Sequence, residues 1–323
     1  MSFPGSNTAP AVLLLNLGGP DSLEAVGPFL YNLFSDREII RLGPPFLQKP
    51  LARLIASLRS AKTRAAYRLI GGRSPIREIT SAQAAALAAV LPGMKVFVGM
   101  RYWEPYIEDA VGELLSAGVR RLIVLSLYPQ YSVATTGSSV AHLKRILAGR
   151  DVELRTIGAW HDHPRYIDAL AAKVKAGLAA FGDSGKVHVL FSAHSLPKKF
   201  IDEGDPYQNQ TEETVRLVAE RVRVPWSLSY QSKSGPVAWL EPSTEAMIEH
   251  LARDGVKQVL AVPVSFVSDH IETLYEIDIL YRNMAARHGI RLERAESLNT
   301  DPVFIDSLKE IVLAAAQEAG WRV

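Results

Sequence analysis

Short apolar runs alternate with longer helical patterns along most of this 323-residue chain. A strand in a parallel sheet is covered on both faces, so it reads as a near-continuous run of Val, Ile and Leu. Strands of this kind that alternate with helical segments are typical of βαβ units. Eight strands are predicted, over residues 11–15, 95–98, 122–127, 152–157, 187–191, 226–230, 259–264 and 290–295.

The eight predicted strands form two sets of four that resemble each other. The segment around Gly118 aligns with the segment around Gly255, and Val152-Glu-Leu aligns with Ile290-Arg-Leu at nearly the same spacing. A duplicated α/β unit explains this, although any two βαβ halves share some likeness. We therefore expect an α/β fold with two parallel sheets, divided into residues 1–160 and 161–323, and a C-terminal helix that packs back on the first half.

Composition narrows the class of protein. With 48% apolar and 22% charged residues, the chain is typical of globular proteins, and disorder and coiled coil are excluded. The formal net charge is only +2, which argues against nucleic-acid binding through bulk electrostatics. That small sum hides nine basic and no acidic residues between Arg41 and Arg77, so the rest of the chain is acidic.

This basic block contains an amphipathic helical pattern and lies where the first half is longer than the second. The pattern alone favours a surface helix docked on its own domain. The alternative is a lip that contacts anionic lipid or an acidic substrate. The apolar stripe consists of Leu47, Leu51, Leu54, Ile55 and Leu58.

The chain contains no cysteine. Disulfides, thiolate zinc sites, iron–sulfur ligation and cysteine nucleophiles are therefore excluded, and metal chemistry has to use His, Asp, Glu or Tyr. No apolar run approaches the roughly 18 residues that a membrane-spanning helix needs. We expect a cytoplasmic protein with at most peripheral membrane contact.

Candidate chemistry lies where predicted strands end, because parallel sheets bind ligands beyond the carboxyl ends of their strands. Polar residues follow the fifth strand at 192–197 and the seventh at 266–276, so His194 and Glu272 are expected on one rim. With His270 and Glu276 they offer nitrogen and oxygen ligands suited to Fe²⁺ or Zn²⁺. Two simpler alternatives are a capping box made by Asp269 and Glu272, and a core histidine bonded to backbone.

Three further loops that follow strands combine aromatic and basic residues, at 101–105, 128–138 and 230–240. Such loops suit a large flat ligand with acidic edges, although some aromatics are expected merely to anchor their loops. A dinucleotide site has little support because residues 18–20 do not form G-x-G-x-x-G. A serine nucleophile elbow is absent as well.

Seven segments resemble the signature segments of ferrochelatases, in the order that the family has them, and the likeness covers about residues 11–310. It implies a chelatase-like fold of two Rossmann-like halves, each with a four-stranded parallel sheet flanked by helices. It also implies insertion of Fe²⁺ into a porphyrin, with release of two protons, in haem biosynthesis. The segments are residues 13–20, 71–76, 99–102, 128–138, 192–197, 230–233 and 268–275.

The resemblance also implies roles for single residues. His194 matches the active-site histidine and Glu272 the catalytic carboxylate that faces it across the macrocycle, and these two with Glu276 are the implied metal ligands. Residues 41–77 coincide with the family's lip, which approaches the membrane, so the lip interpretation replaces the docked helix. The implied substrate-binding residues are Arg68, Arg101, Tyr102, Tyr131, Ser132, Trp239 and His270.

The expected partners are protoporphyrin IX, ferrous iron and an anionic membrane surface, and no nucleic acid. Family members that prefer coproporphyrin have a tyrosine where Leu17 stands, so protoporphyrin is expected and coproporphyrin III is the alternative. Two alternative functions are a non-catalytic porphyrin or haem carrier and a chelatase for a sirohydrochlorin-type ring. No cofactor is expected: Fe²⁺ is a substrate, and the [2Fe–2S] cluster of some members needs cysteines.

Overall fold

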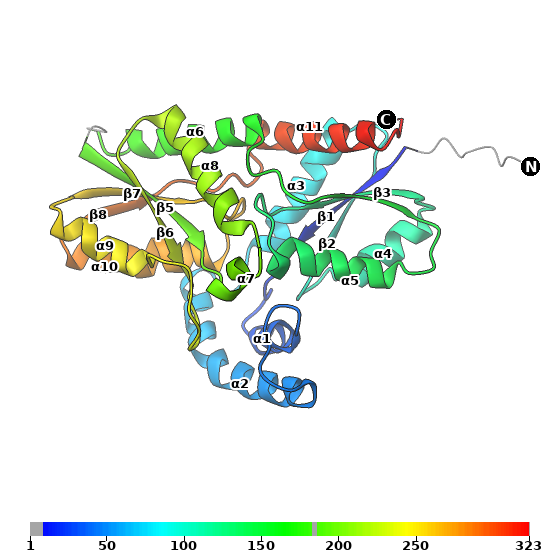
Figure 1. Cartoon of the computed structure of the whole chain (residues 1–323), viewed down its shortest axis with the longest axis horizontal. Helices are drawn as coiled ribbons and strands as arrows, with labels where there is room; N and C mark the ends of the chain where they lie inside the picture. The colour runs from blue at the N-terminus through cyan, green and yellow to red at the C-terminus, as the bar shows by residue number, and fades with distance from the viewer. Residues whose placement is uncertain (1–8, 183–185, 323) are drawn as a thin grey trace, which may run out of the picture.

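Two four-stranded parallel sheets form the centre of the protein in the computed structural model, which describes residues 9–182 and 186–322 (Figure 1). All eight predicted strands are present. The first sheet contains β1 (Ala11–Asn16), β2 (Val96–Met100), β3 (Arg121–Ser126) and β4 (Glu153–Ile157). The second contains β5 (Val187–His194), β6 (Trp226–Gln231), β7 (Gln258–Pro263) and β8 (Arg291–Arg294).

The two sheets have the same strand order, β2-β1-β3-β4 and β6-β5-β7-β8. The likeness extends to a rare element, because a π-helix follows the third strand of each half. These helices are η1 (Val133–Gly137) and η3 (Glu272–Tyr281). The predicted α/β fold with two parallel sheets is confirmed, and the shared order supports the duplication inferred from the sequence.

Helices cover both faces of the first sheet, and alternate residues of each strand face opposite layers. Val12 and Leu14 pack toward the helix α3, whereas Leu13 and Leu15 pack toward α4 and α5. The helices of this half are α1 (Val26–Ser35), α2 (Pro45–Leu69), α3 (Ile76–Val90), α4 (Ile107–Ser116) and α5 (Ser138–Ile146).

The second sheet is covered in the same manner. Val189 and Phe191 share a cluster with α6 and α8, and Leu190 packs toward α9, η3 and α10. The helices of this half are α6 (Pro164–Ala179), α7 (Lys198–Asp202), α8 (Tyr207–Val222), α9 (Thr244–Arg253), α10 (Arg282–Arg287) and α11 (Pro302–Glu318).

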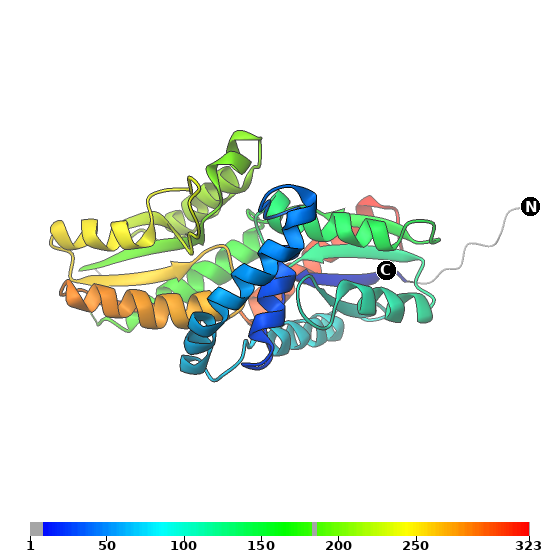
Figure 2. The ribbon, with the colours of Figure 1, turned by 90° about the horizontal axis from the view of Figure 1, so that it is seen from below.

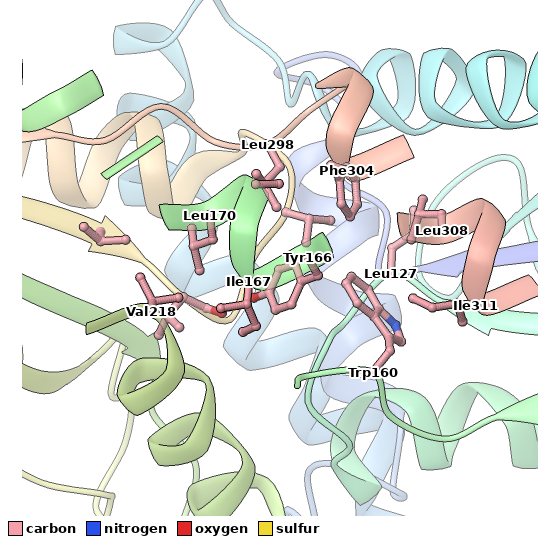
Figure 3. Close-up of a cluster of buried hydrophobic side chains, with 14 of the residues drawn as sticks. Leu127, Trp160, Tyr166, Ile167, Leu170, Val218, Leu298, Phe304, Leu308 and Ile311 are labelled. Atoms are coloured by element: carbon pink, nitrogen blue, oxygen red, sulfur yellow. The ribbon is translucent and has the colours of Figure 1, made fainter. Parts of the chain in front are cut away.

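One apolar cluster runs from the first half into the second (Figure 3). At its centre the Trp160 ring lies 5.0 Å from that of Tyr166 and 6.0 Å from that of Phe304, measured between ring centroids. Phe304 belongs to α11, which packs on α3, β3 and β4 of the first half as well as on α6. The halves therefore share a core, and the division at residue 160 stays a prediction.

The helices α1 and α2 lie apart from both sheets, below them in Figure 1 and across the middle of the molecule in Figure 2. The predicted amphipathic helix is present as α2, and it packs against α1 mainly through small residues rather than through Leu54 and Leu58. Small residues such as Ala52 and Ala56 face α1, because they allow the two backbones to approach closely, while Leu54 and Leu58 are 55% and 73% exposed. Within residues 9–182 and 186–322, no helix has the length and apolar character needed to cross a membrane.

Candidate active site

Three strand ends of the second sheet bring polar side chains together. β5 ends at His194, β6 ends one residue before Ser232, and Glu272 opens the helix η3 that follows β7. Since β5 lies between β6 and β7, these ends meet at one edge of the sheet. The backbone N–H of His194 donates to Ser265 after β7, and its carbonyl accepts from the Tyr207 hydroxyl, so the strand end is held from two sides.

His194 and Glu272, predicted to share one rim, are in direct contact. Nδ1 of His194 lies 2.8 Å from Oε2 of Glu272. Burial disfavours both charged forms, but the mutual attraction and the hydrogen bond outweigh it. The pKa of Glu272 is consequently lowered to about 2, and the pKa of His194 is raised above its ordinary value. An ionised carboxylate therefore orients the imidazole and stabilises its protonated form.

Ser232 joins the two carboxyl groups that the sequence singled out. Its Oγ lies 2.8 Å from Oε2 of Glu272 and 2.5 Å from Oε2 of Glu276. A hydroxyl has one proton to donate, so it serves one carboxylate at a time, and the second carboxyl group fits best when it carries its own proton. Burial and the nearby charge of Glu272 raise the pKa of Glu276 to about 8, which agrees with that arrangement.

A Glu276→Gln variant is expected to gain stability over the wild type as pH rises. The folded-state pKa of about 8 lies above the ordinary 4.5, so between these values the unfolded chain ionises Glu276 while the folded protein keeps it neutral. Wild-type stability therefore falls as pH rises through this range, and glutamine removes that loss. Thermal unfolding of both proteins from about pH 4 to about pH 9 should show a difference in Tm that grows by a few degrees. A constant difference would mean that Glu276 is ionised in the folded protein.

His270 is buried next to this pair, and its ring centroid lies 4.2 Å from that of Phe266. Nδ1 donates to the Ser268 carbonyl at 3.0 Å, whereas Nε2 is buried without a hydrogen-bond partner. Burial lowers the pKa of His270, so the ring is neutral and keeps an acceptor at Nε2. A buried acceptor with no partner is available to a ligand or a proton.

The first half also reaches this site. Burial raises the pKa values of Tyr67 and Tyr128, and the Glu272 charge adds to the effect, so both phenols lie within its field and stay neutral. Ile271, beside Glu272, packs on the cluster that contains Tyr67 and Tyr102. The site is therefore built by both halves, with its titratable groups on the second.

Sequence reasoning placed Ser232 and Tyr128 in two of the predicted ligand-binding loops without naming either as a site residue, and it missed Tyr67. Ser232 could have been predicted from its position after a strand, because it directly follows β6, the neighbour of β5. It also has φ of 68°, an uncommon conformation for a residue other than glycine. Tyr67 gave no such signal, since it lies inside α2.

The remaining predicted substrate residues are spread around the site. Arg101 and Tyr102 both bind Asp36 at 2.7 Å and line a cavity of about 730 Å³ with residues of α1 and α4. The Ser132 hydroxyl is buried and donates to Asp205 of the second half at 2.9 Å.

The other three predicted substrate residues are Tyr131, Trp239 and Arg68. The Tyr131 side chain is half-buried, and its backbone N–H donates to Gln210. Trp239 is half-buried and pairs through its backbone with Pro197 in the segment that follows β5. Arg68 is exposed at the end of α2.

No group of three or more His, Asp or Glu side chains in the described part of the chain is arranged to hold a metal ion. His194, Glu272 and Glu276 are linked pairwise instead, through the ion pair and Ser232. Comparison with known proteins adds the chemistry. A family profile described as Ferrochelatase matches residues 9–316. The chain belongs to the ferrochelatase family.

Relatives support this assignment over nearly the whole chain. Proteins named ferrochelatase from Geobacter metallireducens and Gloeobacter violaceus are 57% and 52% identical to it over 310 and 315 residues. Each match covers 94% of this chain, with 98% and 96% of the relatives. The ferrochelatase resemblance of the sequence motifs is thus confirmed, and with it the enzyme class of a metal-inserting lyase.

Solved structures agree on the fold. SirB from Bacillus subtilis with Fe³⁺ superposes with a TM-score of 0.56 at 14% identity, over 76% of this chain and 92% of that chain. The sirohydrochlorin chelatase SirB in complex with cobalt gives 0.55 at 12% identity, with the same coverage. At this identity the likeness shows that the ferrochelatase-family chain shares the chelatase fold.

Proposed function

We propose that this protein inserts Fe²⁺ into protoporphyrin IX and releases two protons to give protohaem. The observation that carries the proposal is the ion pair of His194 and Glu272 at the carboxyl edge of the second sheet. Metal insertion replaces two pyrrole N–H bonds by bonds to one dication, so a site for it needs bases close to oxygen and nitrogen donors. This pair offers both.

His194 is the first base in this proposal. Because Nδ1–H donates to the ionised Glu272, the proton of the neutral ring is held at Nδ1 and Nε2 carries the lone pair. Nε2 takes a pyrrole proton, and Glu272 stabilises the imidazolium that results. The raised pKa of His194 favours that transfer.

Glu272, Glu276 and Ser232 serve the metal and the second proton. Carboxylate oxygens and imidazole bind Fe²⁺ well enough to receive it, yet release it more readily than thiolates. Ser232 connects the two carboxyl groups, so when the protonated Glu276 releases its proton to solvent, the proton accepted at Glu272 passes through Ser232 to take its place. Iron stays ferrous throughout, and no electron donor is needed.

The other predicted residues hold the macrocycle. Tyr131 and Trp239 supply half-buried aromatic surface, and Arg68 supplies an exposed cation for a propionate. Arg101, Tyr102 and Ser132 are engaged by Asp36 and Asp205, and they support the walls of the site from behind. His270 offers its unpartnered Nε2 to the substrate.

The experiment that tests this proposal compares porphyrins. Purified protein is incubated with Fe²⁺ or Zn²⁺ and protoporphyrin IX, coproporphyrin III or a sirohydrochlorin-type ring, and loss of porphyrin fluorescence is followed. Fastest turnover is expected with protoporphyrin, because Leu17 stands where coproporphyrin-preferring members have tyrosine. Tight binding with no turnover would leave a porphyrin or haem carrier as the function, and a preference for another ring would change the substrate.

The same protein is proposed to contact anionic membranes through α2. Phe46, Leu54 and Leu58 are 76%, 55% and 73% exposed on a helix inside the basic segment 41–77. Buried apolar groups and basic residues add in binding to an anionic surface. Leu58→Asp should weaken co-sedimentation with phosphatidylglycerol liposomes by about tenfold or more.

The matched control for the membrane prediction is Trp226→Asp, at the start of β6, where an exposed apolar side chain lies far from α2 in the sequence. It should bind liposomes like the wild type, and raised salt should weaken both. Equal binding by Leu58→Asp and the wild type would remove α2 from the contact.

A further inference from the structure

A largely buried arginine outside the proposed site holds the helix that carries the carboxylates of that site. Arg294 is the last residue of β8, and its side chain is only 11% exposed. Its Nη1 lies 2.9 Å from Asp269 Oδ1, and its Nε lies 2.9 Å from Asp278 Oδ2. One guanidinium thus joins a residue three positions before η3 to a residue well inside η3.

The two aspartates lie on different parts of the chain. Asp269 belongs to the loop three residues before η3, whereas Asp278 is the seventh residue of η3. The double ion pair therefore fixes the interior of the helix relative to the loop that leads into it.

Asp269 itself is fixed by the chain that follows Arg294. It accepts hydrogen bonds from Ser297 at 2.7 Å and from the side chain of Asn299 at 2.9 Å. Asn299 adopts φ of 44°, and its carbonyl accepts from Gln83 of the first half. Asp269 is therefore held in place by several hydrogen bonds, and Arg294 links Asp278 to this fixed residue.

In the sequence, Glu272 and Glu276 lie between Asp269 and Asp278, the two residues that Arg294 binds. We propose that Arg294 is a positioning residue for metal insertion: by holding Asp269 and Asp278 together, it fixes η3 relative to the loop that precedes it and so presents both carboxylates to His194 and Ser232. This inference rests on the proposed function. Arg294 forms no contact with either glutamate, so it acts through the helix.

The test replaces Arg294 by alanine and measures Zn²⁺ insertion into protoporphyrin by the full-length protein. We expect kcat to fall about 10- to 100-fold, as for other residues that orient metal-site ligands, with KM for porphyrin within about twofold. Added guanidinium ion should restore much of the lost rate, because it can occupy the vacated space between the aspartates. Amide exchange over residues 272–281 should also become faster.

The matched control is Arg282→Ala. Arg282 also pairs with Asp278, at 3.1 Å, and with Glu293, at 3.3 Å, but it is 42% exposed and does not reach Asp269. It should retain a near wild-type rate. If Arg294→Ala does not fold, Arg294→Lys serves instead: an ammonium reaches one carboxylate at a time, so the rate should fall and guanidinium should not restore it.

Three results would overturn the inference: a folded Arg294→Ala or Arg294→Lys with the wild-type rate, an equal loss in Arg282→Ala, or a loss in Arg294→Ala that guanidinium leaves unchanged. The proposed function fails separately, if the wild-type protein inserts no metal into any porphyrin. In that case amide exchange over 272–281 still reports whether Arg294 holds the helix.

Discussion

His194→Ala is expected to lower kcat for metal insertion by about 100- to 10,000-fold, the usual contribution of a positioned base. The imidazole is the group whose free nitrogen faces the reacting porphyrin in our proposal, and its partner Glu272 cannot replace it at that point. Porphyrin binding should change little, because the aromatic and basic residues that hold the macrocycle lie on other elements. The measurement is steady-state turnover of Zn²⁺ and protoporphyrin, together with porphyrin affinity from fluorescence quenching.

The control for this variant is His188→Ala on the same strand. His188 is half-buried nearer the start of β5 and bonds Ser227 at 2.9 Å, so its loss also removes a strand histidine with a partner. It should insert metal like the wild type. If both variants lose activity equally, or if neither does, His194 is not the base and its pair with Glu272 serves stability.

Much of the site can be predicted from the positions of the strands and from the residues that follow them. Parallel strands deliver their carboxyl ends to one edge, so His194 and Glu272, far apart in sequence, are expected together and lie 2.8 Å apart. The same logic extends to Ser232, once the strand order places β6 beside β5. Sequence alone does not give that order, because several arrangements of four parallel strands bury the same apolar runs.

Other features depend on packing that no local pattern encodes. The leucine stripe of α2 predicts a helix correctly, but which face is buried is decided by α1, against which Ala52 and Ala56 fit closely. Arg101 lies in a loop rich in aromatic residues, which suggests ligand contact, whereas its partner Asp36 comes from the end of α1. Local spacing does not reveal such long-range ion pairs.

The π-helical form of η3 is another feature that the local sequence pattern does not predict. Residues 272–281 read as an ordinary helix with a capping box, since a period near four does not separate an α-helix from a wider one. The arginine on β8 that joins Asp269 to Asp278 is not predicted either, because its place is known only once β8 is known to lie beside β7.

Glu272→Gln is expected to reduce kcat by about 100-fold or more and to shift the pH profile in a direction that identifies its role. Burial opposes the protonated form of His194, and the Glu272 charge outweighs this in the wild type, so removing that charge lowers the pKa of His194. A base must be neutral to accept a proton, so the acidic limb of kcat/KM should move to lower pH. Glu276→Gln should have a milder effect below about pH 8, because Glu276 is neutral there and glutamine resembles it. Wild-type turnover by Glu272→Gln, or an acidic limb that does not move, would show that this carboxylate does not set the basicity of His194.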